Sequence, residues 1–185
     1  MKILITGATS GFGKAMAEKF ASEGNDLVVT GRRADRLDEL AKELIEKFAV
    51  QVSTKVFDVQ NKEEVFNALA NDHNLEDVDV VVNNAGLALG RDFFDEASLE
   101  DWETMIDTNV KGLLYVTKAM LPYLVKRGKG HIVNIGSTAG MEVYEKGNVY
   151  CATKHAVEAL SKSMRIDLVR HNIKVTAIHP GAADT

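Results

Sequence analysis

Three side chains late in the chain have the types and the spacing that a single reaction could use. Ser137 carries a hydroxyl, Tyr150 a phenol and Lys154 an ammonium. Tyr150 and Lys154 are four positions apart, so on a helix their side chains would lie on one face, one turn apart. A free tyrosine has a pKa of about 10, and a positive charge within about 4–6 Å favours its ionised form. Tyr150 is therefore a candidate general acid and base.

The same pair could be no more than one face of an amphipathic helix. Tyr123 and Arg127 repeat the tyrosine-to-cation spacing elsewhere in the chain. Short motifs of this kind identify a site only when the surrounding elements fit it. The interpretation of Tyr150 and Lys154 therefore depends on the elements that would position them.

A glycine-rich turn follows the first apolar run, at residues 3–5. Its sequence is Gly7-Ala-Thr-Ser-Gly11-Phe-Gly13, and a helical pattern that ends at Gly24 comes next. A strand, a glycine turn and a helix in this order present free backbone N–H groups and the positive end of a helix dipole to a phosphate. The turn is not a nucleoside-triphosphate loop, because Ala8 and Ala15 occupy positions that need Gly and Ser or Thr. The glycine turn predicts a site for the pyrophosphate of a dinucleotide. A turn without a ligand is the alternative, because the spacing differs from the usual dinucleotide motif Gly-x-Gly-x-x-Gly.

Two arginines follow the second apolar run, where the adenosine ribose of a bound dinucleotide would lie. NAD-binding sites usually place Asp or Glu at this point to bind the ribose 2′-hydroxyl. This chain has Gly31, Arg32 and Arg33 instead. A guanidinium binds the 2′-phosphate that a carboxylate would repel, so the pattern favours NADP over NAD. A solvated helix start is the alternative interpretation of the two arginines.

Apolar runs alternate with helical patterns along the chain, and two helix starts have capping-box spacing, Asn61 with Glu64 and Ser98 with Asp101. This alternation predicts an α/β fold, a doubly wound parallel sheet (Rossmann fold) with right-handed crossovers, in a single domain over residues 1–185. Ligands of such sheets bind beyond the carboxyl ends of the strands. The strands are expected at residues 3–5, 27–29, 50–57, 78–82, 132–136 and 173–178, and the residues at their carboxyl ends include Gly7, Arg32, Asp58, Asn83, Ser137 and Pro180.

Length and composition limit the possible classes of protein. At 185 residues and 45% hydrophobic, the chain can bury one sizeable core. A net charge of −5 without a large basic cluster argues against nucleic acid or an anionic membrane as the main partner. Cys151 is the only cysteine, which excludes an internal disulfide, favours a cytoplasmic location and fits a small packed side chain. The N-terminus does not resemble a signal peptide, no stretch resembles a membrane span, and the five histidines lack metal-ligand spacing.

Six short motifs occur together in one order along the chain. They are Thr6-Gly7-x-x-x-Gly11-x-Gly13, Asn83-Asn84-Ala85-Gly86, Asn109, Ser137, Tyr150-x-x-x-Lys154 and Pro180-Gly181-x-x-x-Thr185. With these motifs the chain resembles the short-chain dehydrogenase/reductase family over its whole length. Three further stretches, residues 83–90, 101–109 and 130–140, are similar to the NADP-dependent 3-hydroxy acid dehydrogenases of that family.

The resemblance implies a catalytic role for four residues. Tyr150 would exchange a proton with the substrate oxygen, Ser137 would hydrogen-bond that oxygen, and Lys154 would lower the pKa of Tyr150 and bind the nicotinamide ribose. Asn109, which its helical context alone would make structural, would hold a water next to Lys154. The residues implied to bind the cofactor are Gly7, Thr9, Ser10, Gly11, Phe12, Gly13, Arg32, Arg33, Asp58, Val59, Asn84, Ala85, Gly86, Tyr150, Lys154, Pro180, Gly181 and Thr185.

The expected function is an NADP-dependent oxidoreductase that interconverts a secondary alcohol and a carbonyl. Its expected substrate is a small 3-hydroxy acid such as serine or 3-hydroxypropionate. A reductase of a bulkier ketone or 3-oxoacyl group, and a sensor that binds NADP without chemistry, are the alternatives. Ser10 stands where many NADP-dependent relatives have a basic residue, so the NADP prediction depends on Arg32 and Arg33.

Two expectations concern what surrounds this domain. Relatives continue past the Pro180-Gly181 turn into a substrate-covering lid and a seventh strand, so a chain of six strands that ends at Thr185 would lack both. The helical pattern after Ser98 has an apolar stripe wider than packing on a sheet requires. Together with the resemblance, this stripe predicts a homodimer or homotetramer.

Overall fold

The computed structural model describes residues 1–182 and contains one parallel sheet of six strands, in the order β3-β2-β1-β4-β5-β6. Every neighbouring pair is parallel. The order reverses between β1 and β4, which is the point where sheets of this kind bind ligands. The strands are β1 (Lys2–Ile5), β2 (Asp26–Gly31), β3 (Val52–Val56), β4 (Val80–Asn83), β5 (Gly130–Ile135) and β6 (Ile173–Ile178). The predicted doubly wound α/β fold is confirmed, with β3 shorter than the expected run.

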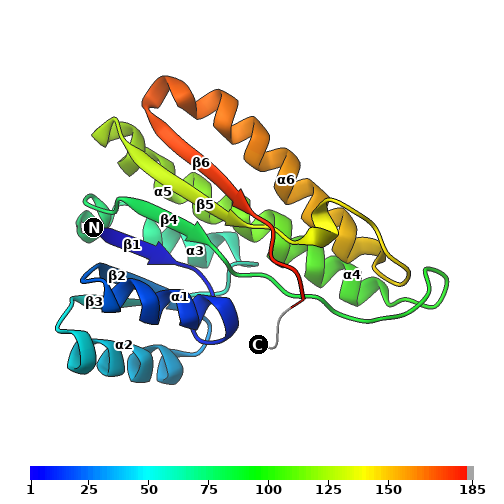
Figure 1. The fold of residues 1–185 in the computed structure, drawn as a ribbon, viewed down its shortest axis with the longest axis horizontal. Helices are drawn as coiled ribbons and strands as arrows, with labels where there is room; N and C mark the ends of the chain where they lie inside the picture. The colour runs from blue at the N-terminus through cyan, green and yellow to red at the C-terminus, as the bar shows by residue number, and fades with distance from the viewer. Residues whose placement is uncertain (183–185) are drawn as a thin grey trace.

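Helices cover the two faces of this sheet (Figure 1). Helices α1 and α2 pack on one face, and α3, α5 and α6 pack on the other. Strand β6 lies at one edge, and its outward-facing residues Lys174, Thr176 and Ile178 are exposed. The helices are α1 (Gly11–Ser22), α2 (Ala34–Phe48), α3 (Lys62–Leu69), α4 (Leu99–Ile106), α5 (Leu113–Arg127) and α6 (Asn148–Leu168), with short 3₁₀ turns at His73–Leu75, Thr138–Gly140 and Val169–His171.

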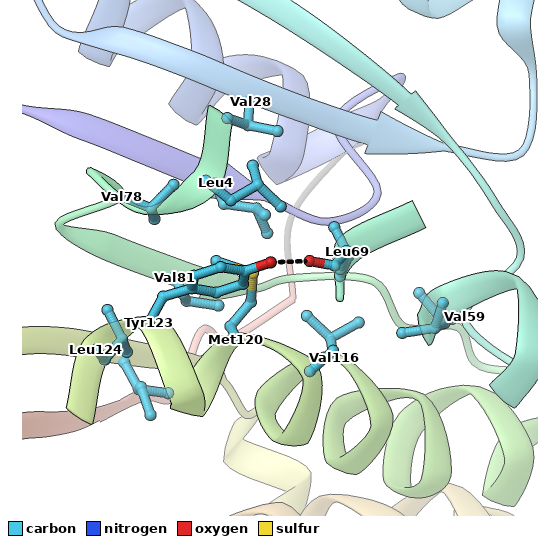
Figure 2. Packing of buried hydrophobic residues seen from close by; sticks show 14 of the residues in the cluster. Leu4, Val28, Val59, Leu69, Val78, Val81, Val116, Met120, Tyr123 and Leu124 are labelled. Carbon is cyan, nitrogen blue, oxygen red and sulfur yellow. Dashed lines mark hydrogen bonds between the residues drawn. The ribbon is translucent and has the colours of Figure 1, made fainter. Parts of the chain in front are cut away.

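The strand runs are apolar without alternation because both faces of the sheet are buried, one against α1 and α2 and the other against α3 and α5. Leu4 of β1 and Val81 of β4 are fully buried and belong to one cluster with Met120 and Tyr123 of α5 (Figure 2). Each large apolar side chain buried in this way contributes about 1.5–3 kcal/mol. The Tyr123 hydroxyl donates to the Leu69 carbonyl at 2.7 Å, so the phenol also ties α5 to the end of α3.

The predicted helix starts have the expected caps. The Asn61 side chain accepts from the backbone N–H groups of Glu63 and Glu64, and the Ser98 hydroxyl accepts from the N–H of Asp101. The long helical pattern after Ser98 is not one regular helix, however. A π-helical segment, Asp107–Gly112, separates α4 from α5. Such segments often occur at functional sites.

Candidate active site

The glycine-rich turn between β1 and α1 has the shape that a phosphate requires. Gly7 and Gly11 have positive φ angles of 65° and 53°. A Cβ on Gly13 would lie 2.2 Å from the Gly7 carbonyl oxygen, so only glycine allows the turn to close this tightly. Ser10 is the N-cap of α1, but its side chain forms no cap hydrogen bond. The first-turn N–H groups of α1 are therefore left for an anionic ligand, and the turn fits a pyrophosphate.

Hydrogen bonds join this turn to the end of β4. The Thr6 hydroxyl accepts from the N–H groups of Asn84 and Ala85, both at 3.0 Å. The Asn84 amide donates to the carbonyls of Thr6 and Gly7 at 2.8 and 3.2 Å. The Asn-Asn-Ala-Gly motif therefore holds the glycine turn in place as well as contributing to the wall of the site.

The two arginines lie at the carboxyl end of β2, as predicted. The Arg33 guanidinium donates to the Thr9 hydroxyl at 3.0 Å, and Nη1 of Arg32 lies 3.5 Å from a carboxylate oxygen of Asp58. A Cβ on Gly31 would lie 3.2 Å from Cγ2 of Thr9, so an acidic side chain at this position would require Thr9 to shift slightly. The pocket at this end is cationic and fits a 2′-phosphate.

Helix α6 places Tyr150 and Lys154 on one face, as the spacing predicts. Nζ of Lys154 lies 5.9 Å from the centre of the Tyr150 ring and donates to the Ile135 carbonyl at 3.0 Å. The lysine is only 7% exposed. This burial lowers the pKa of Lys154 from 10.5 to about 8.

Ser137 follows β5 and is held from several sides. Its hydroxyl accepts from the N–H of Ala139 at 3.2 Å and keeps its own proton to donate. Nδ1 of His179 lies 3.1 Å from the Ser137 carbonyl, and Nε2 lies 3.0 Å from the Glu158 carboxylate on α6. Both acceptors lack a proton, so both bonds form together only when the imidazole is doubly protonated. The ring of His179 thus links the serine backbone to the helix that carries Tyr150.

Asn109 lies in the π-helical segment and is 2% exposed. The Asn109 side-chain oxygen accepts from the N–H of Leu87 at 2.9 Å, and its amide nitrogen donates to the Leu87 carbonyl at 2.8 Å. The same nitrogen also donates to the Thr153 hydroxyl at 3.1 Å. The amide therefore fixes the loop after β4 against α6. Its implied role of holding a water next to Lys154 stays a prediction.

These residues surround one cavity of about 830 Å³ at the carboxyl ends of the strands. Gly13 and Asn109 are not on its wall: Gly13 packs behind the turn, and Asn109 is buried behind Leu87. Thr185 lies outside the described residues. The predicted residues that the structure brings together on the wall are Gly7, Thr9, Ser10, Gly11, Phe12, Arg32, Arg33, Asp58, Val59, Asn84, Ala85, Gly86, Ser137, Tyr150, Lys154, Pro180 and Gly181.

Sequence reasoning missed several residues of the wall, among them Arg91, Thr108 and Tyr144. Arg91 and Tyr144 lie in loops without periodicity, so no pattern pointed to them. Thr108 follows Asp107 in the π-helical segment, and its hydroxyl has no partner among residues 1–182. Burial raises the pKa of Tyr144, and charge interactions reach it from Tyr150 and Arg91, so these groups lie near one another.

Neither a metal site nor a membrane-spanning helix is found among the residues that the structure describes. Residues 1–182 contain no cluster of three or more His, Cys, Asp or Glu side chains arranged to hold a metal ion. None of the helices described there has the length and apolar character needed to cross a membrane. Cys151 is buried and unpaired, as expected for a packed side chain.

Known proteins share both the sequence and the fold of this chain. The family model described as short chain dehydrogenase matches residues 1–185. NADP-dependent 3-hydroxy acid dehydrogenase YdfG of Salmonella typhi is 50% identical over 182 residues, which are 98% of this chain and 72% of that protein. Sulfoacetaldehyde reductase 2 of Chromohalobacter salexigens is 46% identical over 185 residues, 99% of this chain and 73% of that protein.

A solved structure gives the same result in three dimensions. The closed form of serine dehydrogenase complexed with NADP⁺ superposes with a TM-score of 0.90 at 47% identity, covering 98% of this chain and 72% of that one. The aligned part of the chain includes the glycine turn, the sheet and the helix that carries Tyr150. The resemblance inferred from the motifs is confirmed: this chain belongs to the short chain dehydrogenase family.

Proposed function

We propose that this protein oxidises the hydroxyl of a small 3-hydroxy acid, or reduces the corresponding carbonyl, with Ser137, Tyr150 and Lys154 as its catalytic residues. That it is an NADP-dependent oxidoreductase follows from the family and from its similar relatives. The observation that carries the proposal is the cavity, which has a phosphate-binding turn and two arginines at one end and a phenol, a hydroxyl and an ammonium at the other. Serine and 3-hydroxypropionate carry primary hydroxyls, so the reaction is not limited to secondary alcohols.

Each of the three side chains has a separate task in this reaction. The bound nicotinamide supplies the acceptor or donor of a hydride. Tyr150 takes the hydroxyl proton in oxidation and returns it in reduction. Ser137 donates a hydrogen bond to the same substrate oxygen, using the proton that its bond with Ala139 leaves free. The Lys154 ammonium, 5.9 Å from the Tyr150 ring centre, stabilises the phenolate that forms.

The side chains at the end of β2 support the preference for NADP. Arg33 is held by Thr9, and Arg32 lies beside Asp58, which supports a role for both guanidinium groups in binding a 2′-phosphate. The free N–H groups at the start of α1 suit the pyrophosphate. Asp58 is the only carboxylate on the cavity wall within residues 1–182, and it lies beside Arg32.

Replacing Tyr150 by Phe tests the chemistry. The variant should lose turnover, measured as absorbance at the nicotinamide band, while NADPH fluorescence still reports binding. Tyr115→Phe is the matched control, because within residues 1–182 the Tyr115 hydroxyl is not on the cavity wall. Substantial turnover by Tyr150→Phe would contradict the assigned role.

A substrate panel separates the proposed substrate from its alternatives. L-serine, 3-hydroxypropionate and 3-hydroxyisobutyrate would be compared with bulkier secondary alcohols, with NADP and then with NAD. We expect turnover with the hydroxy acids and NADP. Turnover of the bulky alcohols alone would indicate a ketone reductase, and NADP binding without any turnover would indicate a sensor.

A further inference from the structure

We infer that Arg91 binds the acidic group of the substrate, a carboxylate or a sulfonate that is separated from the carbinol carbon by one carbon. The inference rests on the proposed function and makes it more specific. Four cations line the cavity in the described structure: Arg32, Arg33, Arg91 and Lys154. Arg32 and Arg33 lie at the end proposed for the cofactor's adenosine, and Lys154 lies behind Tyr150. Arg91 occupies neither position.

The other three cations already have proposed tasks, Arg32 and Arg33 at the 2′-phosphate of the cofactor and Lys154 beside Tyr150, and they also have protein partners. Arg33 donates to Thr9, Arg32 pairs with Asp58, and the Lys154 ammonium is buried against the Ile135 carbonyl. Within residues 1–182, Arg91 takes part in no ion pair. A guanidinium on a cavity wall without a protein anion is available to an anionic ligand.

The loop that carries Arg91 is fixed against the start of the catalytic helix. The Asn148 amide, two residues before Tyr150, donates to the Asp92 carbonyl at 3.3 Å. Nζ of Lys146 lies 4.3 Å from the centre of the Phe93 ring. These contacts place the backbone next to Arg91 at a defined position relative to Tyr150.

The same loop is also fixed from the side of α4. The rings of Phe94 and Trp102 lie 4.8 Å apart, and the Trp102 indole donates to Asn148 at 3.1 Å. At its other end, Leu87 is held by Asn109. The loop connects β4 to α4 (Figure 1), and its residues Leu87, Ala88 and Arg91 line the same cavity as Tyr150.

The charge around this loop makes a local cation necessary. Arg91 is followed by Asp92, Asp95 and Glu96, and the whole chain carries a net charge of −5. Such a surface repels an anionic substrate unless a positive group stands where the anion must bind. The planar fork of Arg91 can donate two parallel hydrogen bonds to a carboxylate or to two oxygens of a sulfonate.

Three substrates that share a 2-hydroxyethyl group and differ in the attached group test this inference: 3-hydroxypropionate, 2-hydroxyethanesulfonate and the neutral 3-hydroxypropionamide. Arg91→Met should lower kcat/KM for the wild type's preferred anion about tenfold, the lower range for a charged hydrogen bond, and lower kcat/KM for the amide much less. Arg91→Lys should restore part of the loss. Added salt should weaken anion turnover in the wild type more than in Arg91→Met.

Each outcome separates this inference from the proposed function. Turnover of the anions by the wild type, with equal losses for acid and amide in Arg91→Met, would refute the role of Arg91 and leave the proposed function standing. No turnover of any of the three by the wild type, with NADP bound, would refute both. A wild-type preference for the carboxylate or for the sulfonate decides which acid the arginine serves.

Discussion

Replacing Lys154 by Met should make the protein more stable at neutral pH while abolishing its turnover. Lys154 is buried, and its pKa is lowered from 10.5 to about 8. A depression of this size corresponds to about 3 kcal/mol of unfavourable charge burial at pH 7, at about 1.36 kcal/mol per pKa unit. Loss of the hydrogen bond to the Ile135 carbonyl costs about 1 kcal/mol. The net gain should be about 2 kcal/mol, because the unbranched Met side chain fills the same space.

The pH dependence of this gain distinguishes charge burial from better packing. As pH rises through about 8, native Lys154 loses its proton, whereas the unfolded chain keeps it until 10.5. The wild type therefore gains stability from this group between these values. The advantage of Lys154→Met should fall from about 2 kcal/mol at pH 7 to near zero at pH 10.

The measurement is denaturant unfolding of the wild type and of Lys154→Met at pH 7 and pH 10. A gain of this size also raises Tm by about 4–8 °C in a chain of this length. Lys118→Met on α5 is the control, since that lysine is exposed and its replacement removes no buried charge. A variant that is less stable at pH 7, or a gain that persists at pH 10, would refute the reasoning.

Three further predictions follow from the cofactor end, from the histidine behind Ser137 and from the outer helices. Replacing Arg32 and Arg33 together by Ala should weaken NADP binding at least tenfold and NAD binding much less; equal losses in titrations with the two cofactors would contradict the 2′-phosphate role. Bonds from Lys162 and, less strongly, from His179 lower the pKa of Glu158 against the effect of burial. The bonded carboxylate therefore stabilises the fold above about pH 4.5 and loses this effect as pH falls through its lowered pKa. Glu158→Gln should therefore destabilise the folded protein by about 1 kcal/mol at pH 7 and progressively less in acid. Equal destabilisation at both pH values in urea unfolding would contradict this. Leu99 on α4 and Ile166 on α6 are 69% and 74% exposed. Because exposed apolar surface often marks an interface, we expect these helices to form a homodimer contact, and a monomer in light scattering would show that prediction to be wrong.

Much of the site could be predicted from the sequence because its key residues belong to periodic elements. A four-residue spacing on a helix determines that Tyr150 and Lys154 share a face, whatever the helix packs against. The glycine turn is equally local, since Gly13 must lack a side chain for the turn to close on Gly7. Continuous apolar runs such as residues 27–29 indicate strands buried on both faces, and these strands form the centre of the sheet.

The tertiary structure alone decided which loops reach the reacting end of the cavity. Arg91 and Tyr144 come from segments without periodicity, and their places depend on contacts such as Asn148 with Asp92 that join distant parts of the chain. The π-helical segment around Asn109 likewise interrupts a pattern that predicts one regular helix. Local spacing and burial determine helices, strands and tight turns, whereas a loop takes its position from side chains far away in the sequence, which no local pattern records.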